Sequence, residues 1–332
     1  MDIAIAGAGV MGRLLAWQLA RAGHRVVVAD PSEGPTQPRA AGFTAAGMLS
    51  PLAEREQAGA EVAELGWRSL ALWPQIAAAL GRPELVKVEG ALLLAHGADG
   101  GAAQRVLARL GGGPEPLNRV ALQMLEPALA PDLRGWWLPG EGQVLPRELL
   151  AALAEQAPDV SWRWGRAATT VQPHRVALDD GSRLDADLVI DTRGLGARPD
   201  LPTLRGVRGE ILWLHAPGVP LHRPVRLLHP RHRVYLVPRP GDIIVVGASE
   251  VESEDRSPIS LRSAVELMAA AQSVLPGLAE ARIVHLETNL RPALPDHQPH
   301  IAHQPGLLRI NGLFRHGWLL APALAEKVLG HV

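Results

Sequence analysis

The first thirty residues constrain the fold of this chain more than any other stretch. Residues 2–6 form an apolar run of strand length, and the pattern Gly7-x-Gly9-x-x-Gly12 follows it directly. A segment with helical periodicity then leads through Gly23, a residue type common at helix C-termini, to a second apolar run that ends in Asp30. This order of elements predicts a β-α-β unit of the Rossmann type.

Each glycine of the motif has a physical role in a dinucleotide site. Gly7 permits the tight turn, Gly9 lets the backbone approach a pyrophosphate, and Gly12 lets the helix pack close to the strand. The phosphates would bind the free N–H groups at the positive end of the helix. Asp30 stands at the distance of about 20 residues at which a carboxylate accepts hydrogen bonds from a ribose diol. Taken alone, the motif also fits a nicotinamide-dependent dehydrogenase.

The overall composition excludes several classes of protein. The 332 residues suffice for a large core and two domains, and a formal net charge of −1 gives no reason to expect nucleic acid or an anionic membrane as partner. No apolar run reaches the length of a spanning helix, about 18 residues, and Asp2 stands where a secretory signal carries positive charge. We therefore expect a cytoplasmic protein. The absence of cysteine excludes thiolate metal sites and a cysteinyl-linked flavin, and we expect no metal.

The middle of the chain continues an α/β pattern. Helical periodicity spans residues 60–80, 102–110 and 148–156, and an apolar stretch at 86–94 predicts a strand. The sequence Asp179-Asp180-Gly181 predicts a hairpin between residues 175–178 and 183–184. A buried-strand run at 188–190 then ends in a small-residue loop that contains Gly194, where doubly wound sheets place ligands.

From residue 209 the pattern changes to short strands and one helix. Residues 211–214, 234–237 and 243–247 predict strands, and 261–275 predict a helix. This α+β character suits a substrate domain inserted into the nucleotide domain. The chain then returns to an apolar strand run at 307–311 and a helix after Gly317, whose N-terminus could stabilise a buried anion.

Several motifs in chain order resemble the FAD-dependent glycine oxidases of the D-amino acid oxidase superfamily. They are Gly7-x-Gly9-x-x-Gly12 with Asp30, Thr44-Ala45-Ala46-Gly47-Met48-Leu49, Tyr235-Leu236-Val237-Pro238-Arg239 leading to Gly247-Ala248-Ser249-Glu250, Leu290-Arg291-Pro292, and Phe314-Arg315-His316-Gly317-Trp318-Leu319-Leu320-Ala321-Pro322. The matches extend over nearly the whole chain. Three positions depart from the family pattern: Asp30 replaces a usual Glu, His316 a frequent Asn, and Asp191-Thr192-Arg193-Gly194 is closer to the D-amino acid oxidase form.

The resemblance implies an α/β fold with a Rossmann-type FAD-binding domain and an inserted α+β substrate domain. We expect residues 1–80, 140–205 and 285–332 to form the FAD-binding domain, and 81–139 and 206–284 the substrate domain. The FAD would be bound without a covalent bond. The positions that the resemblance assigns to it are Gly7, Gly9, Val10, Met11, Gly12, Asp30, Pro31, Ala41, Gly42, Ala46, Gly47, Met48, Ala168, Gly194, Gly312, Leu313, Phe314, Arg315, His316, Gly317, Trp318 and Leu319.

An amino acid oxidase must also hold the substrate carboxylate, for which a planar guanidinium is the best-shaped side chain. By its place in the motif Arg291 is the candidate, Tyr235 would donate its phenol to the same carboxylate, and Arg315 would lie near substrate and flavin. The implied reaction moves a hydride from the α-carbon to the flavin, gives an imine that hydrolyses to a 2-oxo acid and ammonia, and ends with O2 reduced to hydrogen peroxide. In this family the imine from glycine can feed thiazole synthesis for thiamine.

Several alternatives stay open at this point. The same scaffold serves D-amino acids, sarcosine and other small amines, as oxidase or dehydrogenase, and pocket volume cannot be obtained from the sequence. A nicotinamide dehydrogenase and a non-catalytic flavin-binding protein are the alternatives from other classes. We expect a homo-oligomer.

Overall fold

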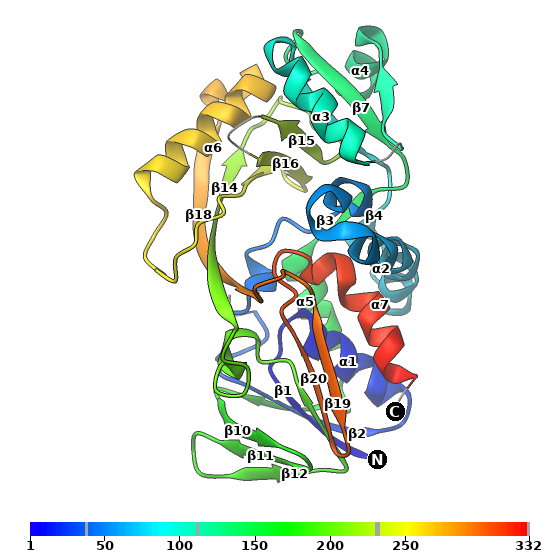
Figure 1. Cartoon of the computed structure of the whole chain (residues 1–332), viewed down its shortest axis with the longest axis vertical. Helices are drawn as coiled ribbons and strands as arrows, with labels where there is room; N and C mark the ends of the chain where they lie inside the picture. The colour runs from blue at the N-terminus through cyan, green and yellow to red at the C-terminus, as the bar shows by residue number, and fades with distance from the viewer. Residues whose placement is uncertain (37–38, 111–112, 230–232, 331–332) are drawn as a thin grey trace.

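The computed structural model describes residues 1–36, 39–110, 113–229 and 233–330, and the structural statements below concern these residues. Two large sheets form the two parts of an elongated molecule, and both termini lie in the part that contains β1 and β2 (Figure 1).

The first sheet has six strands in the order β19-β20-β13-β1-β2-β9. All neighbours are parallel except β19, which runs antiparallel to β20. Its strands are β1 (Asp2–Ala6), β2 (Arg25–Asp30), β9 (Ser161–Trp164), β13 (Leu188–Asp191), β19 (His300–Gln304) and β20 (Leu307–Asn311). The carboxyl ends of β1, β2 and β13 therefore meet at one edge, which confirms the predicted Rossmann arrangement.

Three helices pack against this sheet and against one another. They are α1 (Val10–Arg21), α5 (Pro146–Glu155) and α7 (Gly317–Leu329), and α1 contacts both of the others. Leu14, Leu15, Leu153 and Leu320 are fully buried in the shared core, so the apolar periodicity of each helix matches the face it buries.

The second sheet has eight strands in the order β18-β14-β17-β16-β15-β5-β7-β6. Its pairs are antiparallel except β5 with β15. The strands are β5 (Ala91–His96), β6 (Glu115–Leu117), β7 (Leu133–Leu138), β14 (Arg205–His215), β15 (Val225–Leu228), β16 (Arg233–Arg239), β17 (Ile243–Gly247) and β18 (Arg282–Ala293). Helix α6 (Leu261–Val274) covers one face and buries Leu267 and Ala271 there.

Strands β14 and β18 connect the two parts of the molecule. They pair along their whole lengths, from Arg205 opposite Ala293 to His215 opposite Arg282. In Figure 1 they rise from the part with the parallel sheet to the part with α6. Residues near the C-terminal end of β18 are thereby placed between the two sheets.

The remaining elements lie around these sheets. They include three helices, α2 (Pro51–Ala79), α3 (Gly100–Leu110) and α4 (Arg119–Leu125). They also include two three-stranded sheets, with the strand orders β3-β8-β4 and β10-β11-β12. Short 3-10 helices occur at residues 41–43, 83–85, 97–99, 194–197 and 276–280. The strands of the small sheets are β3 (Met48–Leu49), β4 (Val86–Lys87), β8 (Gly142–Val144), β10 (Ala168–Gln172), β11 (Arg175–Leu178) and β12 (Arg183–Asp185).

Most predicted elements are present, with two informative differences. The hairpin of β11 and β12 is confirmed, as are the helices near 102–110, 148–156 and 261–275. The predicted strand at 86–94 is wrong as a single element, because Gly90 has a φ of 82° and divides it into β4 and β5. Helix α2 begins at Pro51 rather than near residue 60, and Gly59, with a φ of 84°, interrupts it. The domain boundaries drawn from the sequence stay a prediction.

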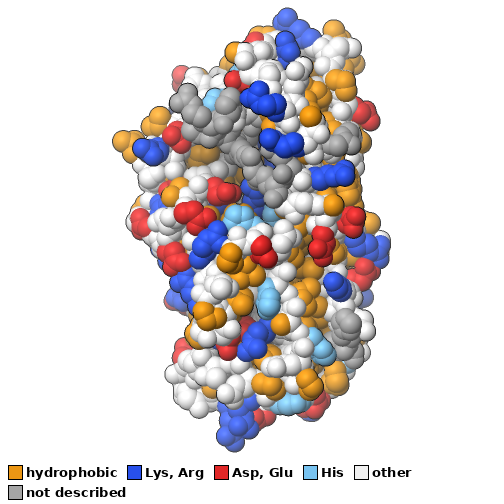
Figure 2. All heavy atoms as spheres, in the orientation of Figure 1, with side chains coloured by type: hydrophobic (Ala, Val, Ile, Leu, Met, Phe, Trp, Pro, Cys, Tyr) orange, Lys and Arg blue, Asp and Glu red, His pale blue; other side chains and the backbone are white. Residues whose placement is uncertain are grey.

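The surface and the helices show two further properties. Basic and acidic side chains are interspersed on the face in Figure 2, in keeping with the small net charge. Among the described helices, none combines the length and the apolar character needed to cross a bilayer.

Candidate functional site

A single large cavity of about 1380 Å³ brings the predicted site residues together. Its size exceeds the usual range for one small ligand, roughly 300–1,000 Å³. The predicted residues that line it are Gly7, Gly9, Val10, Met11, Asp30, Pro31, Ala41, Gly42, Ala46, Gly47, Met48, Ala168, Gly194, Tyr235, Arg291, Leu313, Phe314, Arg315, His316, Gly317, Trp318 and Leu319. Two predicted residues, Gly12 and Gly312, do not line it.

The glycine-rich turn has the geometry that a pyrophosphate requires. Gly7 has a φ of 101°, and a Cβ there would lie 2.7 Å from the carbonyl oxygen of Thr192. Gly9 precedes α1, and a Cβ there would meet only Ala40, at 3.7 Å, so the backbone is open to a ligand. A Cβ on Gly12 would overlap the carbonyl oxygen of Gly7 at 1.9 Å. Gly12 therefore shapes the turn from behind and is not part of the cavity wall.

Asp30 organises the carboxyl edge of the sheet. Its Oδ2 accepts a hydrogen bond from the Ala8 N–H at 2.6 Å, and its Oδ1 accepts one from the Ser32 N–H at 2.8 Å. The carboxylate is buried and still lines the cavity. It thus fixes the glycine-rich turn and also faces the cavity, as predicted for a carboxylate that would bind a ribose.

Arg13 is a residue of this region that the sequence reasoning missed. Its side chain is fully buried and donates to the carbonyl oxygens of Ala8, Pro35 and Leu150, each at 2.8 Å. Its guanidinium also lies over the ring of Phe43 at 5.2 Å. Burial lowers the pKa of Arg13 to about 10, so it stays charged at neutral pH. The sequence signal for a buried role was a charged residue directly after Gly12, inside a helix predicted to be apolar.

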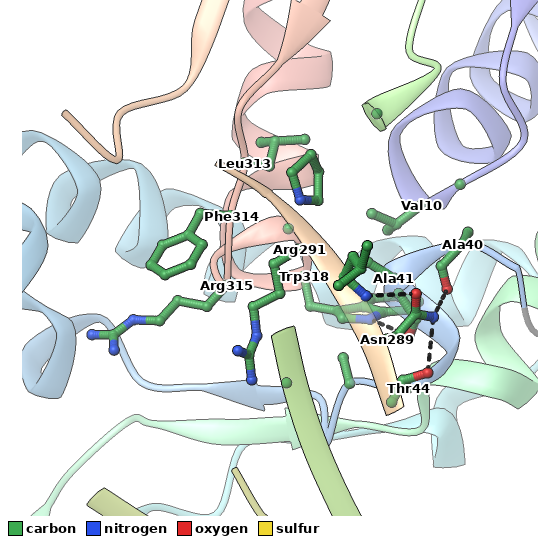
Figure 3. Close-up of a pocket in the computed structure, with 18 of the residues that line it drawn as sticks. Val10, Ala40, Ala41, Thr44, Asn289, Arg291, Leu313, Phe314, Arg315 and Trp318 are labelled. Atoms are coloured by element: carbon green, nitrogen blue, oxygen red, sulfur yellow. Dashed lines mark hydrogen bonds between the residues drawn. The ribbon is translucent and has the colours of Figure 1, made fainter. Parts of the chain in front are cut away.

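The loop of residues 40–48 forms the next wall of the cavity and is tied at several points. Trp318 Nε1 donates to the carbonyl oxygen of Gly42 at 3.0 Å, and Asn289 Nδ2 donates to Thr44 Oγ1 at 3.0 Å and to the Ala40 carbonyl oxygen at 3.3 Å (Figure 3). The Arg239 guanidinium donates to the carbonyl oxygen of Ala46. This loop, in which Phe43 and Met48 are the two large side chains, is thereby held by residues from β16, β18 and α7.

The segment before α7 closes the cavity from the opposite side. Gly312 has a φ of 70°, and a Cβ there would lie 2.6 Å from Leu294 Cδ1, so its role is in the turn. His316 occupies the N-cap position of α7, and residues 317–319 line the cavity. Burial lowers the pKa of His316 to about 4, so its imidazole is neutral at physiological pH. The cavity therefore faces the positive end of a helix, as predicted for stabilising a buried anion.

Arg291 lies on β18 with its guanidinium in the cavity. Its Nη1 donates to the carbonyl oxygens of Ser249 at 3.1 Å and Arg208 at 3.4 Å. In the part of the chain that the structure describes, no carboxylate lies within ion-pair distance of it. Burial lowers its pKa, as expected for a guanidinium removed from water. Most of its donor capacity is therefore available to a ligand.

Two glycines to which the sequence analysis assigned no role in the site, Gly209 and Gly247, make room for the polar side chains. A Cβ on Gly209 would lie 2.4 Å from the Arg291 guanidinium carbon, and one on Gly247 would lie 2.7 Å from the Tyr235 hydroxyl. Burial raises the pKa of Tyr235, so its phenol stays protonated and able to donate. Both glycines lie on strands next to those that carry Arg291 and Tyr235. Their role follows only from the pairing of these strands, which the sequence does not show.

Arg315 has a different environment from Arg291, although Figure 3 shows both side chains reaching toward the same part of the cavity. Its Nη2 pairs with Glu54 Oε2 at 2.6 Å, and its Nη1 with Glu250 Oε2 at 3.3 Å. Glu54 also pairs with Arg226 Nη2 at 2.8 Å. Neither Glu54 nor Arg226 was predicted from the sequence, because each is isolated in its own segment and only the fold brings them together.

The residues present fit a flavin adenine dinucleotide. The N-terminus of α1, behind the open Gly9, would suit the pyrophosphate, and the buried Asp30 carboxylate would suit the ribose. The N-terminus of α7 would suit the negative charge of the reduced flavin. The loop of residues 40–48 lines the cavity with backbone, small side chains and Met48, a surface against which a flat ring system would fit. A Cβ at Gly47, which has a φ of 68°, would lie 2.5 Å from the Val144 carbonyl oxygen.

Comparison with known proteins gives a consistent result. The model of the FAD dependent oxidoreductase family (DAO) matches residues 2–329. A protein of Rhizobium etli that is named as a thiamine biosynthesis oxidoreductase, ThiO, is 42% identical over 329 residues, which cover 99% of this chain and 95% of that protein. The bifunctional protein ThiO/ThiG of Synechocystis is 28% identical over 98% of this chain, and the match spans 51% of its length.

The fold comparison agrees with the sequence comparison. Glycine oxidase from Geobacillus kaustophilus is 28% identical over 352 residues, which cover 97% of this chain and 90% of that protein. Its crystal structure superimposes with a TM-score of 0.87, covering 99% of this chain and 93% of that one. The FAD predicted from the sequence is thereby confirmed, and the nicotinamide and non-catalytic alternatives are wrong. This chain belongs to the FAD dependent oxidoreductase family.

Proposed function

We propose that this protein oxidises glycine, and with it other small amines or D-amino acids, to the imine and 2-oxo acid with release of ammonia and hydrogen peroxide. The observation that carries the proposal is the Arg291 guanidinium, half-buried in the cavity and paired only with backbone carbonyls among the described residues. A guanidinium that is partly removed from water without a carboxylate is costly unless a ligand supplies one.

The substrate would be bound by its carboxylate at this end of the cavity. The planar fork of Arg291 suits bidentate binding of a carboxylate, and the protonated Tyr235 phenol adds a donor from β16. Both groups are held on strands rather than loops, which limits their movement. The contribution of the chain is thus to fix the α-carbon in one orientation.

The charge that develops in the reaction is met by the fold. When bound, FAD would supply the acceptor for the hydride of the α-carbon, and O2 would be the final oxidant, reduced to hydrogen peroxide. The N-terminus of α7 presents its positive end to the cavity, where it stabilises added negative charge. We assign no general base: His316 is a weak base because of its low pKa, and Tyr235 is protonated.

We further propose that the imine from glycine supplies thiazole synthesis for thiamine. Support comes from the Rhizobium etli relative, whose name places it in thiamine biosynthesis, and from the fused ThiO/ThiG protein. An oxidase or dehydrogenase of D-amino acids or sarcosine is the alternative on the same fold. It is favoured by the loop Asp191-Thr192-Arg193-Gly194, which resembles the D-amino acid oxidase form.

The experiment that tests the proposal is a product analysis in air with four substrates. Purified protein is supplied with glycine, sarcosine, D-alanine or D-proline, and peroxide, ammonia and the 2-oxo acid are quantified. We expect glycine to give glyoxylate, ammonia and peroxide in equal amounts. Turnover of D-alanine or D-proline without turnover of glycine would favour the alternative, and absence of peroxide with every substrate would exclude an oxidase.

A further inference from the structure

One buried carboxylate forms ion pairs with two guanidiniums at the same end of the cavity as Arg291. Glu54, in the first turn of α2, is 7% exposed. Its Oε1 accepts from Arg226 Nη2 at 2.8 Å and its Oε2 from Arg315 Nη2 at 2.6 Å. Burial alone would raise the pKa of Glu54, but the two guanidiniums hold it well below its usual range. Glu54 is therefore a permanent anion.

The other charged groups around Glu54 do not change this balance. His316 Nδ1 lies 3.7 Å from Glu54, and with a pKa of about 4 it is neutral at physiological pH. Glu250, at 3.3 Å from Arg315, is half exposed. The Arg239 guanidinium is directed to Ala46 and Gln143.

Counting these side chains gives the charge that a substrate meets. In contact with Glu54 or beside it, the cations are Arg226, Arg291 and Arg315 and the anions are Glu54 and Glu250. Among the further charged residues that line the cavity, Arg256, Arg262, Glu252 and Glu266 add two charges of each sign. The difference is one positive charge, and the contacts locate it at Arg291, since the other two guanidiniums are in ion pairs. A substrate with one carboxylate balances the site. A second carboxylate would be desolvated beside guanidiniums that are already paired, which is unfavourable.

We propose that Glu54 is a specificity-determining residue that restricts the enzyme to substrates with a single carboxylate, by occupying the two guanidiniums that would otherwise bind a second one. The proposal rests on the proposed function. It predicts that amines with two carboxylates, such as iminodiacetate, are poor substrates. It also predicts that removing the charge of Glu54 creates a site for the second carboxylate on Arg226 and Arg315.

The test compares glycine with iminodiacetate in the wild type and in Glu54→Gln. We expect the ratio of kcat/KM for iminodiacetate to that for glycine to rise on the order of 30-fold in the variant, because charge-assisted hydrogen bonds to two guanidiniums become available. Glu61→Gln is the matched control, since Glu61 is an exposed residue of the same helix. An unchanged ratio in folded, FAD-loaded Glu54→Gln would overturn the proposal.

A double variant separates the effect of the net charge of the site from the effect of the space at position 54. Glu54→Gln with Arg226→Met removes one anion and one cation, so the net charge of the site is that of the wild type. We expect this variant to keep the preference for glycine. A gain of iminodiacetate turnover in the double variant equal to that in the single variant would mean that space, not charge, sets the preference, and would contradict the proposal.

A binding titration keeps the result independent of turnover. Glycolate and malonate carry one and two carboxylates and are followed by the change they cause in the flavin absorbance. We expect the wild type to bind glycolate more tightly and Glu54→Gln to bind malonate more tightly. Should glycine fail as a substrate of the wild type, the proposed function fails, yet this titration still decides the role of Glu54. The same preference for glycolate in both proteins would refute that role.

Discussion

Two arginines that line the cavity differ in whether they already form an ion pair with a carboxylate of the protein. Arg291 and Arg315 both line the cavity, yet Arg315 is in ion pairs with Glu54 and Glu250, whereas Arg291 contacts backbone carbonyls. The two arginines therefore have different roles. We propose that Arg291 is the group that binds the substrate, and Arg315 belongs to the network of ion pairs beside it.

Replacing Arg291 with Ala should remove substrate binding and leave the cofactor in place. We expect the KM for glycine to rise about 100-fold, equivalent to about 3 kcal/mol, because a charge-assisted bidentate pair is lost. The KM of Arg291→Lys should lie between that of the wild type and that of Arg291→Ala, since lysine keeps the charge but not the planar fork of donors. Steady-state kinetics and the flavin absorbance of the purified variants check this. Wild-type KM in Arg291→Ala would contradict the assignment.

Gly209 provides a second prediction at this scale. A Cβ at this position would lie 2.4 Å from the Arg291 guanidinium carbon, so Gly209→Ala should displace the guanidinium. We expect a rise in the KM for glycine of at least about tenfold with FAD binding retained, since misplacement of a positioned group weakens its hydrogen bonds. Gly101→Ala, in the exposed start of α3, is the control. Equal KM values for both variants would argue against this role.

The residues that could be predicted from the sequence are those in contiguous motifs. Gly7, Gly9 and Asp30 carry their spacing with them, and the run from Phe314 to Leu319 lines the cavity as expected. Glu54, Arg226 and Gly209 could not be found in this way. Each acts through a neighbour that is distant in sequence, and strand register or helix placement creates the contact.

At the scale of elements, the start of α2 was the largest difference between sequence and structure. The helix begins at Pro51 and is interrupted at Gly59, so its first turns carry Glu54 into the cavity. Glu141 accepts hydrogen bonds from the N–H groups of Leu52 and Ala53, at 2.9 and 3.3 Å. Helical periodicity is visible only after residue 60, because Leu52 is the one large aliphatic residue between positions 51 and 60. The β-α-β unit and the later strands were predictable because their apolar periods are uninterrupted.

Glu141 predicts a pH dependence of stability at this helix start. Burial raises its pKa from 4.5 to about 7, so between these values the folded protein binds more protons than the unfolded protein. The free energy of unfolding contributed by this group therefore falls as pH rises from 4.5 to 7, by up to about 3 kcal/mol. Glu141→Gln should remove this decrease.

Urea unfolding of the apoprotein at several pH values checks the effect. We expect the difference in unfolding free energy, variant minus wild type, to become more positive from pH 4.5 to pH 8. Glu61→Gln, an exposed change in the same helix, should show no such trend. A difference that is independent of pH would contradict the raised pKa of Glu141.

At the scale of the whole molecule, the cavity joins the two large sheets. Its walls come from β2, α1, β14, β16, β18 and α7, and so from both parts of the chain. A ligand that binds across them stabilises the folded state as a whole. FAD at a concentration of 100 times its Kd should add about 2.7 kcal/mol to the free energy of unfolding.

Thermal unfolding of the apoprotein with and without FAD measures this stabilisation. Asp30→Ala, which removes the acceptor of the Ala8 and Ser32 N–H groups, should reduce the shift in Tm at the same FAD concentration. An equal shift in both proteins would argue against Asp30 as part of the adenosine site. The homo-oligomer expected from the sequence stays a prediction, which light scattering of the FAD-loaded protein would test.

The most direct test of the account is anaerobic reduction of the bound flavin by glycine. The central claim is that the cavity holds FAD at one end and that Arg291 holds an amino acid carboxylate at the other. We predict that the yellow, FAD-loaded protein is bleached by glycine in the absence of oxygen and regains its colour on admission of air. A flavin that stays oxidised with glycine, sarcosine, D-alanine and D-proline alike would contradict the claim.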